Sequence, residues 1–133
     1  MRLLKTKFIL SILFIAVLTA SCGGNRVGSA GPMASGGSII TIEASSYKFA
    51  PNDIRLERPG MLALEIKNVS GSEHNFTIKA PDGRVIKSID IRPHSSIISN
   101  IDLPNPGTYE FYCNKTLHST LGMKGKITVG SGK

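Results

Sequence analysis

The stretch Tyr112–Lys126, YCNKTLHSTLGMKGK, holds three side chains that bind soft or borderline metal ions. They are Cys113, His118 and Met123, and four residues separate each of them from the next. A thiolate, an imidazole and a thioether together suit copper in both of its oxidation states. The stretch therefore predicts a copper site on one loop, and it requires at least one further ligand from elsewhere in the chain.

His74, in the segment EHNFTI, is the candidate for that further ligand. Two His and one Cys, with a weakly bound axial Met, form the sites that transfer electrons on blue copper. Taken singly, each residue has an ordinary interpretation: Cys113 and Met123 as core packing, His118 as a surface loop residue, His74 as a core histidine. The joint pattern, and no single residue, indicates the metal. His94, which follows Arg-Pro, has no such partners, and we predict that it lies on the surface.

Other metal and catalytic chemistries fit this pattern less well. Structural zinc sites take four Cys or His ligands, and a thioether is a poor zinc ligand. A dinuclear copper site would need two Cys in the loop, and Cys113 is the single one there. A Cys–His hydrolase would need a third group to orient the base and a site for the oxyanion, and nothing in the sequence suggests either.

Alternating apolar and polar residues surround the predicted site and indicate β-strands. Met61–Asn68 and Glu73–Lys79 alternate clearly, and Thr108–Cys113 places Cys113 in phase with two aromatic side chains. Turn signals such as Pro-Gly and Pro-Asp-Gly separate the segments. Further short strands are expected at 39–42, 54–56, 85–91, 97–103 and 126–129. With no helical periodicity after residue 21, the pattern predicts an all-β sandwich of seven to eight strands.

From about residue 39 to 129 the sequence resembles the cupredoxins, the small blue-copper proteins that include plastocyanin, rusticyanin and auracyanin. The resemblance rests on His-Asn-Phe at 74–76, on GTYEFYC at 107–113 and on Gly-Met followed by Gly-Lys-Ile at 122–127. The spacing of the loop ligands is most similar to that of the rusticyanin-like and auracyanin-like members. One departure is that residues 114–117 are Asn-Lys-Thr-Leu, where relatives often carry Pro and Gly.

The resemblance implies a Greek-key sandwich holding one mononuclear copper. His74, Cys113 and His118 would be its equatorial ligands and Met123 its weak axial ligand. In the family, the Asn after the first His hydrogen-bonds toward the Cys strand, which implies that role for Asn75. Function would then be one-electron transfer between redox protein partners, by a monomer and without enzymatic activity. A copper carrier that delivers the metal to another protein, and a metal-free β-sandwich interaction module, remain as alternatives.

The first 21 residues have the pattern of an export signal. Arg2, Lys5 and Lys7 precede an apolar run that is too short to span a bilayer easily. The run ends in LTASCGG, which resembles a bacterial lipoprotein box with Cys22 as the lipidated residue. Residues 22–38 are rich in Gly, Ser and Ala and predict a flexible tether. Residues 39–133 would form the cupredoxin domain.

Composition agrees with an exported, membrane-anchored protein on the periplasmic or extracytoplasmic face of a cell membrane. The chain has 133 residues, a formal charge of +7 and two Cys. Lipidation of Cys22 and metal binding by Cys113 would occupy both thiols without a disulfide. Three of the 16 basic residues lie in the signal segment, which leaves 13 basic and nine acidic residues. These basic residues form no run, so nucleic-acid binding is not expected.

Overall fold

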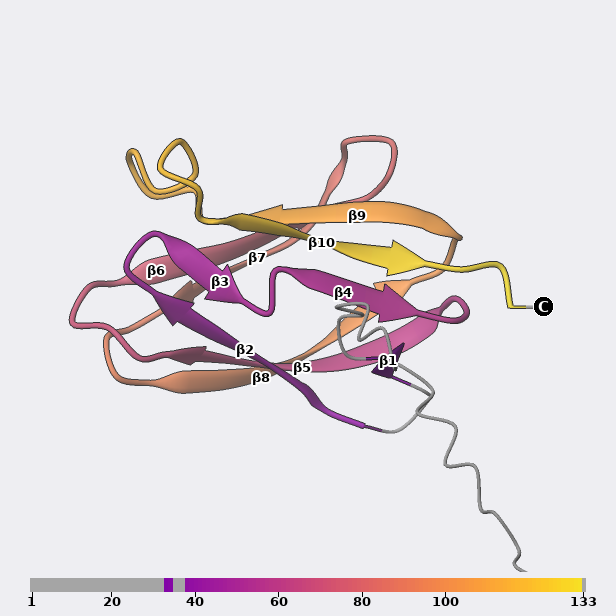
Figure 1. Ribbon diagram of the computed structural model, residues 1–133, viewed down its shortest axis with the longest axis horizontal. Helices are drawn as coiled ribbons and strands as arrows, with labels where there is room; N and C mark the ends of the chain where they lie inside the picture. Colours follow the sequence, from indigo (N-terminus) through magenta and orange to yellow (C-terminus); the bar gives the residue numbers. More distant parts are fainter. Residues whose placement is uncertain (1–32, 35–37, 133) are drawn as a thin grey trace, which may run out of the picture.

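The computed structural model describes residues 33–34 and 38–132. The predicted signal segment, Cys22 and most of the predicted tether lie outside these residues. The described part is an all-β sandwich without helices, which confirms the predicted fold class (Figure 1). Within it there is accordingly no helix with the length and apolarity needed to cross a bilayer.

Two sheets pack face to face. One has six strands in the order β1-β4-β10-β9-β6-β7, and the other has four in the order β3-β2-β5-β8. After β8 the chain returns to lay β9 beside β6, a non-sequential pairing of the kind that Greek-key sandwiches contain. The strands are β1 (Met33–Ala34), β2 (Ile40–Ser45), β3 (Lys48–Ala50), β4 (Asp53–Leu56), β5 (Gly60–Asn68), β6 (His74–Lys79), β7 (Val85–Ile91), β8 (Ser96–Leu103), β9 (Gly107–Tyr112) and β10 (Lys124–Val129).

The strand count exceeds the predicted seven to eight at two places. β3 lies between the strands predicted at 39–42 and 54–56, in a segment where no strand was expected. It pairs with β2 through a tight turn in which Tyr47 has a φ of 62°. β1 lies within the predicted tether, where Met33 and Ala34 pair in parallel with β4. Both strands are too short to show an alternating pattern, so periodicity could not reveal them.

The core lies between the sheets, and three phenylalanines pack at its centre. Phe49, Phe76 and Phe111 have ring centroids 5.1–5.7 Å apart. Phe76 is two residues after His74 and Phe111 two residues before Cys113, so the strand pleat places each ring on the same face as a predicted ligand. The rest of the buried apolar core is formed by Ile40, Ile42, Ala44, Ile54, Leu62, Leu64, Ile66, Ile78, Ile91, Ile101, Leu103, Tyr109, Cys113, Met123, Ile127 and Val129.

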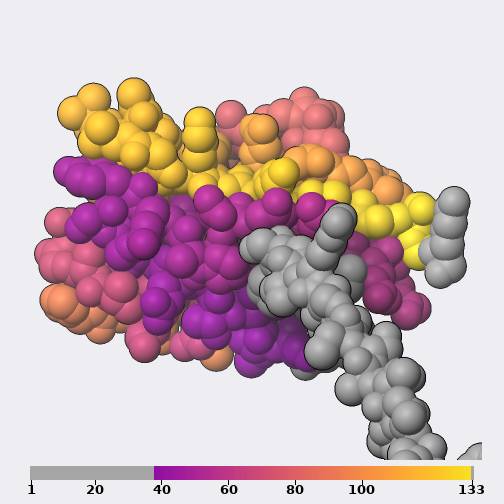
Figure 2. Space-filling view, viewed as in Figure 1, coloured from indigo at the N-terminus to yellow at the C-terminus, as the bar shows by residue number. Residues whose placement is uncertain are grey.

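The loop 113–123 connects two neighbouring strands at one end of the sandwich. β9 ends at Tyr112 and β10 begins at Lys124, and these two residues are paired across the ladder. β10 comes close to its neighbours at Gly125, where a Cβ would lie 2.6 Å from the carbonyl oxygen of Asn52. Figure 2 shows the loop, in orange-yellow, projecting beside the purple segment that includes the β2–β3 turn.

Candidate metal centre

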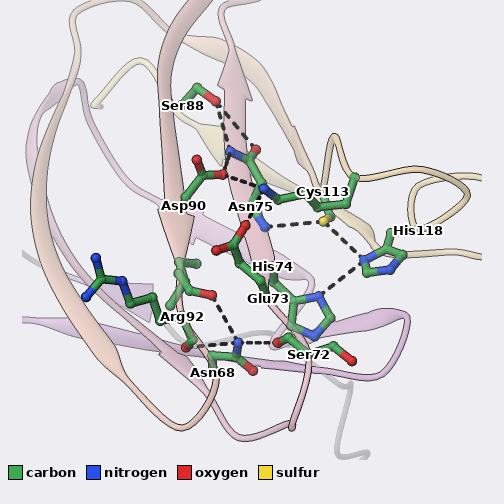
Figure 3. A network of polar contacts seen from close by, with 12 residues as sticks. Asn68, Ser72, Glu73, His74, Asn75, Ser88, Asp90, Arg92, Cys113 and His118 are labelled. Atoms are coloured by element: carbon green, nitrogen blue, oxygen red, sulfur yellow. Dashed lines mark hydrogen bonds and ion pairs between the residues drawn. The ribbon is translucent and has the colours of Figure 1, made fainter.

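Three of the four predicted ligands converge at this end of the sandwich (Figure 3). His74 is the first residue of β6, Cys113 directly follows β9, and His118 lies on the loop. The Nδ1 atoms of His74 and His118 are 3.3 Å apart, and Cys113 Sγ lies 3.4 Å from His118 Nδ1. One ligand atom from each of the three residues lies within 4.8 Å of the others. The structure therefore brings together residues that are up to 44 positions apart in sequence.

His74 is in the form that a metal can bind. Its side chain is 1% exposed. Burial, and secondarily the neighbouring His118, lower the pKa of His74 below its ordinary value. Because the ordinary value already lies below neutral pH, the ring is neutral at pH 7. A neutral imidazole has a lone pair on one ring nitrogen to offer a metal.

Met123 is held at the base of the loop by backbone hydrogen bonds. The Cys113 N–H donates to the Met123 carbonyl at 3.0 Å, and the Met123 N–H donates to the His118 carbonyl at 2.9 Å. The Met123 side chain is fully buried in the same core as Cys113. Gly122, with a φ of 105°, occupies a conformation that side chains disfavour. The glycine before Met123 thus permits the sharp turn that brings the loop back to β10.

The cysteine sulfur accepts a hydrogen bond from the first ligand strand. The Asn75 N–H donates to Cys113 Sγ at 3.3 Å, and Cys113 is fully buried. The connection from Asn75 toward the Cys strand thus runs through its backbone. Its side chain instead points to β7, where Nδ2 donates to Asp90 at 2.9 Å and to Ser88 at 3.1 Å. The hydrogen bond to the sulfur fixes the position of Sγ beside the two imidazole rings.

Lys115 ties the loop to β6 and β7. Its ammonium donates to Glu73 at 2.5 Å and pairs with Asp90 at 3.1 Å. The hydrogen bond with Glu73, and then that with Asp90, raise the pKa of Lys115. Hydrogen bonds from Asn75 and Lys115 lower the pKa of Asp90. The loop that carries His118 is thereby fastened to the start of β6, the strand that carries His74 and Asn75, and to β7.

Sequence reasoning missed the residues that support the ligands. Lys115 lies inside the stretch Tyr112–Lys126, but its acidic partners are 42 and 25 residues away, and no local pattern connects them. Tyr47, whose ring packs edge-on against that of His118 with the ring centroids 5.3 Å apart, lies in a segment for which no role was predicted. Two further residues were likewise not identified. They are Ser70, whose hydroxyl contacts His74 Nε2, and Asn68, which contacts that hydroxyl.

The donor set fits copper on its own chemistry. The cluster presents two imidazole nitrogens and one thiol sulfur, with a buried thioether at the base of the same loop. Soft sulfur donors combined with imidazole suit copper better than they suit the harder divalent ions. No carboxylate belongs to the cluster of described residues.

Comparison with known proteins decides the family. The model of the cupredoxin-like domain matches residues 9–129. The chain belongs to the cupredoxin-like family. It is 30% identical over 121 residues to the major chloroplastic plastocyanin isoform of Arabidopsis thaliana, covering 80% of this chain and 70% of that protein.

Two solved auracyanins have the same fold as this chain. Reduced auracyanin from Roseiflexus castenholzii aligns with a TM-score of 0.63 and 21% identity, over 72% of this chain and 99% of that one. Auracyanin A, a blue copper protein from Chloroflexus aurantiacus, gives 0.58 and 18%, over 70% and 100%. As a cupredoxin with this donor set, the chain is an electron carrier whose cofactor is copper, and it is not an enzyme.

Proposed function

We propose that this cupredoxin carries one electron at a time on a single copper ion bound by His74, Cys113 and His118, with Met123 as the weaker axial ligand. The observation that carries the proposal is the convergence of the two Nδ1 atoms and Sγ within 4.8 Å. When bound, copper supplies a centre that accepts and releases one electron. The protein supplies a fixed set of donors, so that little needs to rearrange when the charge changes.

The chain's own residues protect the site and give it one route to the surface. His74, Cys113 and Met123 are each at most 1% exposed, which excludes water from their side of the site. His118 is partly exposed, so its ring connects the cluster to solvent. Leu117 and Leu121, respectively 65% and 57% exposed, lie on the same loop. We propose that a redox partner docks on this apolar surface and exchanges electrons through His118.

The way in which the donors are anchored also distinguishes an electron carrier from a copper-delivery protein. Delivery requires donors that can be reached and released in turn. Here Cys113 Sγ is anchored by the Asn75 N–H, Met123 is anchored by two backbone hydrogen bonds, and Lys115 fastens the loop between them. These contacts support retention of the metal in both oxidation states.

Substitution of Met123 is expected to change the reduction potential in a defined order. A Gln at this position offers an oxygen that favours Cu(II) and lowers the potential, whereas Leu offers no donor and raises it. We expect each change to be at least about 60 mV, a tenfold change in the ratio of the affinities for the two oxidation states. Voltammetry of the copper-loaded proteins measures this order, Gln below Met below Leu. Identical potentials in the three proteins would remove Met123 from the ligand set.

We also propose that the protein is exported and anchored to the outer face of a cell membrane through lipid on Cys22. The LTASCGG sequence and the Gly/Ser-rich segment after it support this proposal. Full-length protein is expected in the membrane fraction, and Cys22→Ala is expected to lose the lipid. Since a single acyl chain binds membranes only marginally, the lipoprotein type of modification, with more than one chain, is required. Cys113→Ser serves as the control, because it should stay anchored. Mass spectrometry showing an unmodified mature N-terminus, or one at another residue, would refute the anchor.

A further inference from the structure

Asn68 is a buried amide whose orientation is fixed by its surroundings. It is the last residue of β5 and is 1% exposed. The two hydrogens of its Nδ2 are shared among the carbonyl oxygens of Ser72 at 2.7 Å, Ile91 at 3.1 Å and Arg92 at 3.1 Å (Figure 3). Because carbonyl oxygens only accept, the amide nitrogen must face them. The Asn68 Oδ1 therefore faces the opposite way, and there it accepts from the Ser70 N–H at 2.9 Å.

This orientation determines where the hydroxyl hydrogen of Ser70 points. Ser70 Oγ lies 2.9 Å from Asn68 Oδ1 and 3.2 Å from the Ser72 carbonyl oxygen. Both oxygens can only accept, and a hydroxyl has a single hydrogen to give. If the hydroxyl hydrogen pointed elsewhere, the lone pairs of Ser70 Oγ would face those of the two acceptor oxygens and repel them. The hydrogen of Ser70 is thus committed to an acceptor on this side.

The third neighbour of the Ser70 hydroxyl is His74. The distance from Ser70 Oγ to His74 Nε2 is 2.8 Å. Since the hydroxyl hydrogen is already committed, Ser70 Oγ accepts here, and Nε2 must carry a hydrogen. A neutral imidazole has one N–H, so the lone pair is on Nδ1. Nδ1 is the atom that faces His118 within the metal cluster.

We propose that Asn68 and Ser70 are positioning residues that hold His74 in the tautomer and ring orientation required for metal binding by Nδ1. This inference rests on the proposed function, in which His74 is a copper ligand. Asn68 lies at the end of β5 in one sheet and bonds to the end of β7 in the other. The side chains of Asn68 and Ser70 thereby link the junction of the two sheets to His74.

The hydrogen bond between Ser70 and His74 also affects how strongly His74 binds copper. A hydrogen-bond acceptor on the far N–H of a ligating imidazole increases the basicity of the metal-bound nitrogen. A more basic donor favours Cu(II) over the reduced ion. Loss of the Ser70 hydroxyl is therefore expected to weaken copper binding and to raise the reduction potential. Loss of a partner of this kind typically costs 10–100-fold in metal affinity.

Ser70→Ala, Ser70→Thr and Ser72→Ala form a matched set for the experiment. Ser70→Ala removes the acceptor, and Ser70→Thr restores a hydroxyl. Ser72→Ala removes a hydroxyl two residues away in the same loop, where the contacts described above use only the Ser72 backbone. Asn68→Ala would remove all the hydrogen bonds of a buried amide, those of Nδ2 and those of Oδ1, and endangers the fold, so Ser70 carries the test.

The first readout is the ring of His74 in the metal-free protein, by long-range ¹H–¹⁵N NMR. We expect the Nε2–H tautomer in the wild type, with slow exchange of that hydrogen. Exchange should accelerate at least about tenfold in Ser70→Ala and be unchanged in Ser72→Ala. A wild-type His74 carrying its hydrogen on Nδ1 would overturn the inference, as would unchanged exchange in Ser70→Ala.

The second readout is copper binding and reduction potential. Ser70→Ala should lower Cu(II) affinity at least about tenfold and raise the potential, with Ser70→Thr restoring both toward wild type. Equal values for Ser70→Ala and Ser72→Ala would overturn the inference while leaving the proposed function intact. A wild type that binds copper without an intense visible band would contradict the proposed function, and the metal-free NMR would still decide the tautomer.

Discussion

Cys113→Ser abolishes the intense visible colour that we expect of the copper-loaded protein. The colour arises from charge transfer between a thiolate and Cu(II), and a serine oxygen gives no such band. Cys113 Sγ is fully buried, lies 3.4 Å from His118 Nδ1 and accepts a hydrogen bond from Asn75. No other sulfur in the cluster can replace it as a thiolate. Absorption spectra recorded with metal analysis at one copper per chain would measure the effect.

The chain offers a matched control for this substitution. Cys22 is the other of the two cysteines, and it lies in the predicted lipoprotein box. Cys22→Ser, prepared as a soluble protein, should keep the full band intensity. A Cys113→Ser protein with the wild-type spectrum would exclude the proposed site, because the colour would then come from another copper environment.

His118→Ala should cost more copper affinity than any change in the surrounding residues. Loss of an outer partner of a ligand costs 10–100-fold, so loss of the ligand itself is expected to exceed about 100-fold. Electron exchange with a partner should also slow, because the His118 ring is the partly exposed member of the cluster. Titration with Cu(II) against a competing chelator measures the affinity, and stopped-flow oxidation measures the exchange.

His94→Asn is the control for His118→Ala. His94 is exposed, is not among the clustered donors and has a φ of 52°, a conformation that Asn tolerates. It should therefore leave both measurements unchanged. If His118→Ala and His94→Asn behaved alike, His118 would be neither a ligand nor the route for electrons.

The inward direction of His74 and Cys113 could be predicted from the sequence because both lie where a strand pattern is clear. His74 begins an alternating strand and Cys113 ends one, so the pleat alone indicated that both point inward. Their burial confirms this. That the two strand ends adjoin follows from pairing of β6 with β9, which no local pattern contains. At this step only the family resemblance supplied the arrangement.

The supporting contacts could not be predicted in the same way. Asn68 follows a clear strand pattern, yet its side chain bonds to carbonyls 23 and 24 residues away. Lys115 lies on the loop, and its ammonium forms ion pairs with both Glu73 and Asp90. Such contacts depend on the relative placement of two sheets, which periodicity does not determine. β3 was missed for a related reason, because its three residues follow a turn and are recognised through their pairing with β2.

Repeated reduction and oxidation of the copper-loaded protein in the presence of a weak Cu(I) chelator tests the central claim most directly. The ligands are buried, hydrogen-bonded and fastened by Lys115, so copper should stay bound in both states. We predict a reversible one-electron wave whose amplitude persists over many cycles, with no copper in the chelator fraction. Transfer of copper to the chelator during the first reductions would contradict the account, and delivery of the metal would become the better description of what this protein does.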